Sequence, residues 1–351
     1  MTRRCRRSLL RLGGTALAVA VAAPAAARPA RAQDATPGAA PPSSLGWNDE
    51  LAEGNGKVNV VSTVAPISSI VRNVGGSRID LRGVVPDGTN SHTFEPAPSD
   101  ARILAAADLI FVNGLALEQP TIALAEANLK EGAEIVVLGD RTIDPEAWVF
   151  DFSFPESEGD PNPHLWTNVP YAMRYAELVA EALSARDPEN AGSYEKNRDR
   201  FLAVLERLDA AILEAVQTIP EPNRRLLTYH DSWAYFAPHV GITVIGAAQP
   251  SDFSEPSPRE VAALIDQIRD EAVPAVFGSE VFPSDVLEQI AAEAGANYVD
   301  ELRDDDPPGE PNAPEHTYVG MMLRNMELMI PALGGSVEAL AGIAPYDTYV
   351  P

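Results

Sequence analysis

The stretch PENAGSYEKNRDRFLAVLERLDAAILEAVQTIP, residues 188–220, decides the fold. Its apolar residues recur at three- and four-residue steps, which places them on one face of a helix. They are Tyr194, Phe201, Leu205, Leu208, Ile212 and Val216. Roughly 28 helical residues at 1.5 Å each predict a helix about 42 Å long. Because no proline interrupts it, we expect a rigid connecting helix over residues 188–219 that limits how far the flanking segments can move apart.

Short apolar segments alternate with helical segments on the N-terminal side of this helix. Each strand-like segment is almost wholly apolar and rich in β-branched residues, as in a parallel sheet that helices cover on both faces. Residues 47–187 therefore predict an N-terminal α/β lobe. Its expected strands are residues 58–67, 79–85, 109–114 and 134–140.

The same alternation returns on the C-terminal side, over residues 220–351. The expected strands are residues 224–231, 242–248, 275–280 and 297–302, and the expected helices are 257–272, 284–295 and 317–333. The prediction is an α/β fold of two lobes. Each lobe is a mostly parallel sheet flanked by helices, and one long rigid helix joins the two.

The first 32 residues have the composition of a secretory signal peptide. An arginine-rich start, MTRRCRRSLLRLGG, precedes a short apolar run, and the small residues at Ala30 and Ala32 suit a cleavage site. That run is too short for a membrane span. The stretch RRSLLRL also resembles a twin-arginine export signal, so twin-arginine and ordinary Sec export both stay open. Residues 33–46, rich in proline, serine and alanine, predict a disordered tether.

Cysteine usage limits the chemistry of the exported protein. The only cysteine, Cys5, lies in the segment to be removed, so we expect no disulfide and no thiolate ligand. No cysteine follows the apolar run, which predicts a protein without a lipid-anchor cysteine. We therefore expect a soluble, monomeric protein in the periplasm or another extracytoplasmic space.

The charge of the chain excludes several classes of partner. The formal net charge is −25, and export would remove seven arginines and no acid. So acidic a body repels nucleic acid and anionic membrane surfaces. Cations remain plausible ligands, although acidity by itself often serves solubility.

Four side chains stand where a strand ends or a loop enters a helix. They are His92, His164, His230 and Asp305, and successive members stand more than sixty residues apart. That spacing excludes a local zinc-finger or HExxH arrangement. Ligands of open α/β sheets bind beyond the carboxyl ends of the strands, so a cleft between the lobes could gather all four. Imidazole and carboxylate suit a divalent transition metal such as Zn²⁺, with scattered surface histidines as the alternative.

Several blocks of the chain resemble one family in the order in which that family carries them. The blocks are HTFEPAPSDARILAAADLIFVNG, DPNPHLW, SYEKNRDRFLAVLERLD, TYHDSWAYFAPHVGI, VFGSE and EHTYVGMMLRNMELMI, between Val58 and Leu333. The family is the solute-binding proteins of manganese, zinc and iron ABC transporters, the adhesin-like periplasmic metal receptors. The resemblance implies a receptor that holds its metal with His92, His164, His230 and a late aspartate, Asp305, and delivers it to an ABC permease.

The late aspartate has close competitors. Asp304 and Asp306 flank Asp305, and a proline-rich segment follows them. Glu280, at the end of a strand, is expected either to orient a ligand histidine from behind or to make a structural hydrogen bond. Asp231, beside His230, has the same two interpretations.

The two remaining histidines are expected to serve other purposes. His239 stands near a helix C-terminus just before Gly241, where a histidine interacts favourably with the helix dipole. His316 precedes a helix and is expected to be exposed. Residues 144–163 contain no histidine, unlike the histidine-rich loop of many zinc receptors in the family that the chain resembles.

The composition of the expected site distinguishes a receptor from an enzyme. A catalytic zinc usually keeps one position open for water beside a general base, whereas three histidines and an aspartate fill four positions. We therefore expect a receptor, with zinc as the preferred ion and manganese or iron as alternatives. A zinc-dependent hydrolase is the runner-up from another class.

Overall fold

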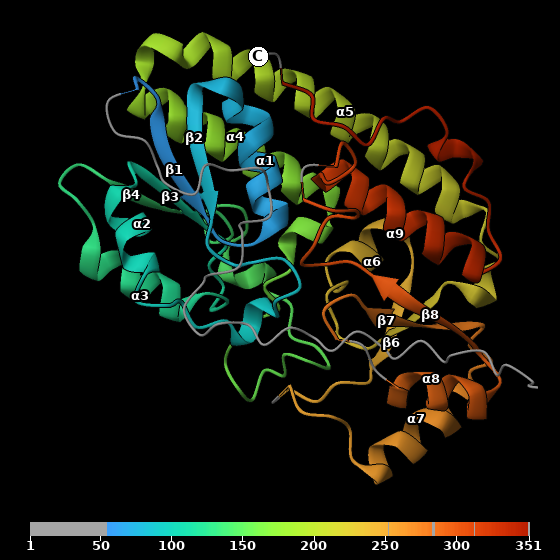
Figure 1. Ribbon diagram of the computed structural model, residues 1–351. Coiled ribbons are helices and arrows are strands. Elements are labelled where there is room, and N and C mark those ends of the chain that lie inside the picture. Colours follow the sequence, from blue (N-terminus) through green and yellow to red (C-terminus); the bar gives the residue numbers. More distant parts are fainter. Residues whose placement is uncertain (1–54, 252, 283–284, 312, 350–351) are drawn as a thin grey trace, which may run out of the picture. The chain divides into compact units, whose positions relative to one another are not determined.

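The computed structural model describes residues 55–251, 253–282, 285–311 and 313–349. The predicted signal peptide and tether lie outside these residues. The α/β prediction is confirmed, because the described residues form two four-stranded parallel sheets flanked by helices (Figure 1). The bounds of the two lobes, 47–187 and 220–351, stay a prediction.

The first sheet has the strand order β2-β1-β3-β4, and every pairing is parallel. Its central strand β1 is buried throughout because helices cover the sheet. The strands are β1 (Val58–Ser62), β2 (Ile79–Gly83), β3 (Leu109–Val112) and β4 (Glu134–Val137), and the helices of this half are α1 (Ala65–Gly75), α2 (Asp100–Ala106), α3 (Gln119–Asn128) and α4 (Val169–Arg186). The first expected strand is shorter than predicted, since Pro66 already stands in the first turn of α1.

The second sheet repeats this arrangement with the order β6-β5-β7-β8, again all parallel. In both sheets the next strand along the chain pairs on one side of the first strand, and the strand after that pairs on its other side. Such a switch of direction opens a crevice at the carboxyl ends of the strands. The elements are β5 (Arg225–Thr228), β6 (Thr243–Ala247), β7 (Ala275–Ser279) and β8 (Asn297–Leu302), with α6 (Phe236–Val240), α7 (Pro258–Asp270), α8 (Asp285–Ala294) and α9 (Tyr318–Ala332).

The long helix is α5 (Ala191–Gln217), with 27 residues. At 1.5 Å per residue its length is about 40 Å. All six apolar residues of the predicted face are buried. The helix packs against α1 and α4 of the first half and against α6 and α9 of the second (Figure 1). Its Phe201 ring lies 6.4 Å from that of Tyr318 in α9.

One apolar cluster runs through both halves. It includes β1 and α4 on one side, β5 and α9 on the other, and the fully buried Trp166 between them. The segment after α9 returns to α1, where Asn73 donates to the Asp347 carboxyl and accepts from the Thr348 backbone N–H. The two halves are therefore tied together by packing as well as by α5.

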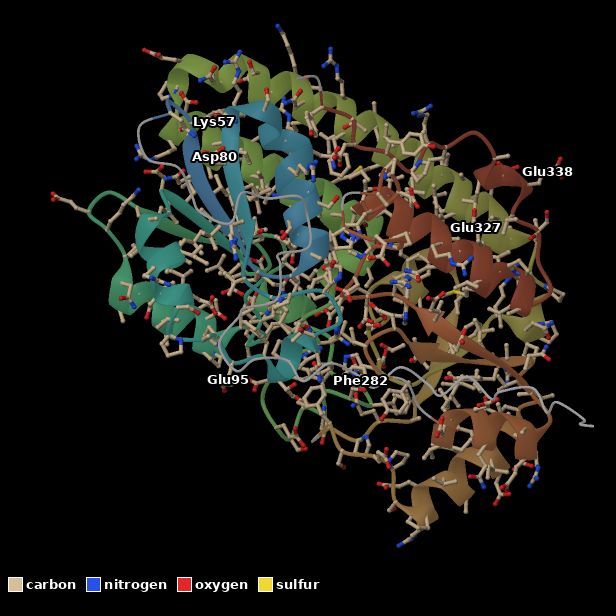
Figure 2. All side chains as sticks on the ribbon, viewed as in Figure 1. Lys57, Asp80, Glu95, Phe282, Glu327 and Glu338 are labelled. Carbon is tan, nitrogen blue, oxygen red and sulfur yellow. The ribbon has the colours of Figure 1, made fainter. Side chains whose placement is uncertain are left out.

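The outer surface carries most of the charged side chains. Lys57, just before β1, forms an ion pair of 3.4 Å with the buried Asp80 of the neighbouring strand β2, and both residues are labelled in Figure 2. Within the described part of the chain, no helix combines the length and the apolar character that a membrane crossing requires.

Candidate metal centre

Each of the three predicted histidines stands just beyond a strand or at the start of a helical turn. His92 lies in the turn Ser91–Thr93 after β2, where the Asn90 side chain accepts a hydrogen bond from the His92 backbone N–H. His164 precedes the turn Leu165–Thr167. His230 follows β5 by two residues. The structure brings all three together, and their ligand atoms lie within 4.8 Å of one another.

The three rings meet through the same nitrogen. The Nε2 atom of His164 lies 3.1 Å from Nε2 of His92 and 3.3 Å from Nε2 of His230. His164 and His230 are buried, with 0% and 2% of their surface exposed, and His92 is half-buried. The opposite nitrogen of two rings faces a side-chain amide oxygen. Nδ1 of His164 lies 2.9 Å from Oδ1 of Asn162, and Nδ1 of His230 lies 3.1 Å from Oε1 of Gln249.

Burial keeps these rings uncharged. It lowers the pKa of His92 and of His164 well below the usual value, and the neighbouring imidazoles lower it further. Burial also lowers the pKa of His230, to about 4, although the hydrogen bond that His230 makes to the Gln249 amide oxygen opposes that shift. Neutral imidazole is the form that binds a metal ion, so the three rings are ready to coordinate near neutral pH.

Three consecutive aspartates, Asp304, Asp305 and Asp306, form an acidic run beside the histidines, and Asp304 is the one nearest to them. Its Oδ2 atom lies 3.6 Å from Nε2 of His164, and its backbone carbonyl accepts a hydrogen bond from Nε1 of Trp166 at 2.7 Å. The expected fourth ligand, Asp305, is turned to another partner: its carboxyl accepts hydrogen bonds from the backbone N–H and the Oγ of Ser91, at 3.1 and 2.9 Å. Asp306 accepts a hydrogen bond from the Gly88 backbone.

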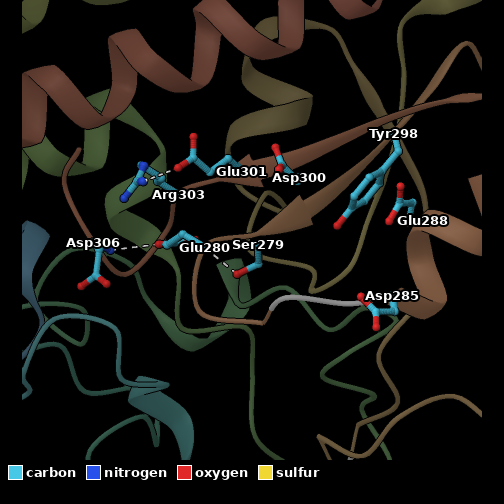
Figure 3. A pocket seen from close by; sticks show the side chains of 9 residues that line it. All are labelled: Ser279, Glu280, Asp285, Glu288, Tyr298, Asp300, Glu301, Arg303 and Asp306. Atoms are coloured by element: carbon cyan, nitrogen blue, oxygen red, sulfur yellow. Dashed lines mark hydrogen bonds and ion pairs between the residues drawn. The ribbon is translucent and has the colours of Figure 1, made fainter. Parts of the chain in front are cut away.

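Glu280 holds the acidic run in this arrangement. Its Oε1 atom accepts hydrogen bonds from the backbone N–H groups of Asp304, Asp305 and Asp306, each at 3.0 Å. Figure 3 shows the Glu280 side chain directed at Asp306. Glu280 therefore makes the structural hydrogen bonds of the second interpretation, and it acts on the aspartates and not on a histidine.

The carboxyl groups of this region lie close together in a buried environment. Burial, the charge of Glu280 and the neighbouring Asp305 raise the pKa of Asp304 well above its usual value. Burial and Glu280 raise the pKa of Asp305 to about 7, and burial raises that of Asp306 to about 8. Buried acids of like charge are costly to ionise unless a cation balances them. This acidic run beside neutral imidazoles therefore favours a bound cation.

Asp231 does not support its neighbour His230. Burial and the nearby carboxyl of Asp151 raise the pKa of Asp231 to about 8, and its backbone carbonyl accepts a hydrogen bond from the Asn162 amide at 2.6 Å.

The prediction that His316 is exposed was wrong. The residue is 5% exposed, because the loop before α9 packs against the first half of the chain, and its Nε2 lies 3.6 Å from the Asp87 carboxyl. His239 approaches Asp209 of α5, with 2.7 Å between Nε2 and Oδ1.

Phenylalanine rings surround the three imidazoles. Phe253 stacks on His92 with ring centres 4.9 Å apart, Phe154 meets His164 edge-on at 5.7 Å, and Phe282 lies 5.8 Å from His230. A cavity of about 190 Å³ opens beside His92, with Phe154, Phe253, Glu158 and Asp160 among its lining residues. The apolar rings reduce the access of water, while the cavity reaches the half-buried histidine.

The two amides and the phenylalanine rings around the site were not predicted from the sequence. Asn162 stands two residues before His164, and this closeness was the one available signal. Gln249 and Phe253 are distant from every ligand along the chain, and no spacing pattern marks them. Trp166 is a core residue, and its indole N–H also supports Asp304 by donating to the Asp304 backbone carbonyl.

Comparisons with known proteins show which family the chain resembles. A family model described as zinc-uptake complex component A, periplasmic, matches residues 60–332. A manganese-binding lipoprotein of Halalkalibacterium halodurans is 28% identical over 277 residues, which cover 79% of this chain and 88% of that protein. A manganese ABC transporter substrate-binding lipoprotein of Streptococcus anginosus is 30% identical over 226 residues, 63% of this chain and 72% of its own. The solved periplasmic zinc-binding protein TroA of Treponema pallidum superposes with a TM-score of 0.71 at 27% identity, covering 79% of this chain and 99% of its own.

The names of the relatives correct one prediction. The sequence interpretation expected no lipid-anchor cysteine, yet both manganese-binding relatives are named lipoproteins. That expectation was wrong. It depended only on the position of Cys5 relative to an apolar run, and both lie outside the described residues. An extracytoplasmic location is consistent with these names.

Proposed function

The chain belongs to the family of the zinc-uptake complex component A, periplasmic, and on this premise we propose that it captures zinc outside the cytoplasmic membrane and delivers it to an ABC permease for import. Membership makes the chain a metal-binding substrate-binding protein of an ABC transporter, and not an enzyme. The metal ion is therefore its cargo, and the site must bind the ion without transforming it.

The convergence of three Nε2 atoms carries the proposal. Two ligands that each lie about 2.0 Å from a zinc ion in a tetrahedron are about 3.3 Å apart. The separations of the His164 Nε2 from the other two rings are 3.1 and 3.3 Å. Two of the three nitrogen–nitrogen separations thus match the spacing of ligands around a tetrahedral zinc ion, which supports the proposal.

We further propose Asp304 as the fourth ligand, in place of Asp305. The 3.6 Å between the Asp304 carboxyl and Nε2 of His164 is close to the same tetrahedral spacing. Asp305 is committed to Ser91, whose neighbour is His92. We propose that Asp305 holds the turn that carries His92 next to the acidic run through its hydrogen bonds to Ser91, and that Asp304 is the fourth ligand of the metal ion.

Zinc is the preferred ion on chemical grounds. Nitrogen-rich sites bind Zn²⁺ more tightly than Mn²⁺, and carboxylate oxygen suits the harder Mn²⁺. Manganese is the second candidate, because the two curated relatives above are named for it. A bidentate Asp304 would raise the coordination number to five, which would accommodate manganese or iron.

Competition titrations on metal-stripped protein test the choice of ion. We expect the wild type to bind Zn²⁺ more tightly than Mn²⁺ and His230→Glu to narrow the gap, because a carboxylate replaces an imidazole. His239→Gln is the matched control, since His239 contacts Asp209 away from the site. A wild type that prefers Mn²⁺, or a ratio unmoved by His230→Glu, refutes the zinc proposal.

A further inference from the structure

We propose that Asn162 is a positioning residue that selects the metal-binding tautomer of His164. The proposal rests on the metal-binding function proposed above and adds to it a residue that does not itself touch the metal. An imidazole ring presents a lone pair on one nitrogen only when the other nitrogen carries the proton. A partner that accepts a hydrogen bond from Nδ1 therefore decides whether Nε2 is free to bind a metal.

The Asn162 side chain is fully buried, and each of its four hydrogen-bonding positions is used. Its Oδ1 atom accepts from the backbone N–H of His164 and faces Nδ1 of the same ring, both at 2.9 Å. Its Nδ2 atom donates to the Asp151 carboxyl at 2.7 Å and to the Asp231 carbonyl at 2.6 Å. A buried amide with all of its bonds formed is held in one orientation.

These partners settle which end of the amide faces the ring. A backbone N–H can only donate, so the atom that it meets must be the oxygen of Asn162. The Asp231 carbonyl can only accept, so the atom that it meets must be the nitrogen. The oxygen thus faces Nδ1 of His164, which must carry a proton to form a hydrogen bond there. The lone pair is left on Nε2, which points at the other two histidines.

The backbone of Asn162 is fixed as firmly as its side chain. Its N–H donates to the Val149 carbonyl at 2.9 Å, and its own carbonyl accepts from the Tyr235 hydroxyl at 3.0 Å. Tyr235 belongs to the second half of the chain, so the backbone of Asn162 is held by residues of both halves. Gln249 faces His230 in a comparable way, but its Nε2 donates only at 3.3 Å, to the Phe253 carbonyl. Asn162 is the more rigid support.

The direct test is the tautomer of His164 in metal-free protein, measured from the ring nitrogen shifts of ¹⁵N-histidine-labelled samples. We expect the proton on Nδ1 in the wild type and in Asn162→Asp, because a carboxylate there still accepts the same hydrogen bond. In Asn162→Leu we expect a mixture of tautomers. A wild-type His164 with its proton on Nε2 overturns the proposal, and this measurement needs no variant to fold and no metal to bind.

Zinc affinity then separates positioning from stability. Loss of such a support typically weakens metal binding about 10- to 100-fold, and we expect this loss in Asn162→Leu. Asn162→Asp gives up both donated hydrogen bonds and places a second carboxyl beside Asp151, so its melting temperature should fall while its zinc affinity stays within about tenfold of wild type. The control Asn73→Leu removes another buried asparagine, which bonds to Ser69 in its own helix and to Asp347 and Thr348 near the C-terminus, away from the histidines.

Each outcome counts for or against the proposal. If the zinc affinity of the two Asn162 variants follows their melting temperatures, as it would for a purely structural residue, the proposal fails. It also fails if Asn162→Leu binds Zn²⁺ as tightly as the wild type. A wild type that binds no metal but carries the Nδ1 proton would refute the proposed function and leave the role of Asn162 intact.

Discussion

Replacing Glu280 tests how the acidic run is built. In Glu280→Ala three backbone N–H groups, those of Asp304, Asp305 and Asp306, lose the one oxygen that accepts from all of them at 3.0 Å. A buried donor left without a partner costs about 1–3 kcal/mol, so the three together would cost about 3–9 kcal/mol. Glu280 also lines a cavity of about 390 Å³ (Figure 3), through which water can replace part of the loss. We therefore expect Glu280→Ala to lose about 3 kcal/mol of the free energy of unfolding.

Chemical denaturation in metal-free buffer measures this free energy of unfolding. Glu280→Gln keeps an oxygen for the three N–H groups and should lose less than half as much as Glu280→Ala. Glu288→Ala is the matched control, because Glu288 is an exposed residue of the same cavity and should change stability by no more than about 0.5 kcal/mol. Zinc affinity should fall at least about tenfold in Glu280→Ala, since Asp304 loses its support. Equal stability of the alanine variant and the wild type, or equal losses in the two Glu280 variants, would refute this account of the acidic run.

Three further predictions concern the ligands. His92→Ala and His164→Ala should each remove most of the zinc-dependent rise in melting temperature. In the wild type, zinc at a hundred times its Kd should stabilise the folded state by about 2.7 kcal/mol. An undiminished thermal shift in both variants would exclude these residues from the site. Asp304→Asn should weaken zinc binding more than Asp305→Asn does in parallel calorimetric titrations, and the reverse order would restore Asp305 as the ligand. Burial and Glu280 raise the pKa of Asp305 to about 7, and the pKa of Asp304 is raised as well. These carboxyls therefore take up protons as the pH falls through neutrality, whereas His230, with a pKa of about 4, stays neutral. Zinc affinity should therefore decline between about pH 8 and pH 6, earlier than the histidine reference pKa of about 6.5 implies; an affinity constant over that range would contradict the carboxyl assignment.

Local patterns in the sequence determined the elements of the fold. The apolar period of α5 and the apolar runs of most of the described strands depend on neighbours a few residues apart, so they can be recognised without knowledge of distant contacts. The order of the blocks around His92, His164 and His230 identified the family, and the structure brings these three rings together. Residue type and position at the ends of strands were sufficient for that result.

Only the tertiary structure decided which aspartate faces the histidines and what orients the rings. Asp304 and Asp305 are the same residue type one position apart, and their directions depend on Glu280 and Ser91, which reach them from distant parts of the chain. The amide of Asn162 lies close to His164 along the chain, but its orientation also depends on the Asp231 carbonyl, which belongs to the other half of the molecule. The direction of a side chain within a loop depends on hydrogen bonds between segments that only folding brings into contact, and a local sequence pattern carries no record of them.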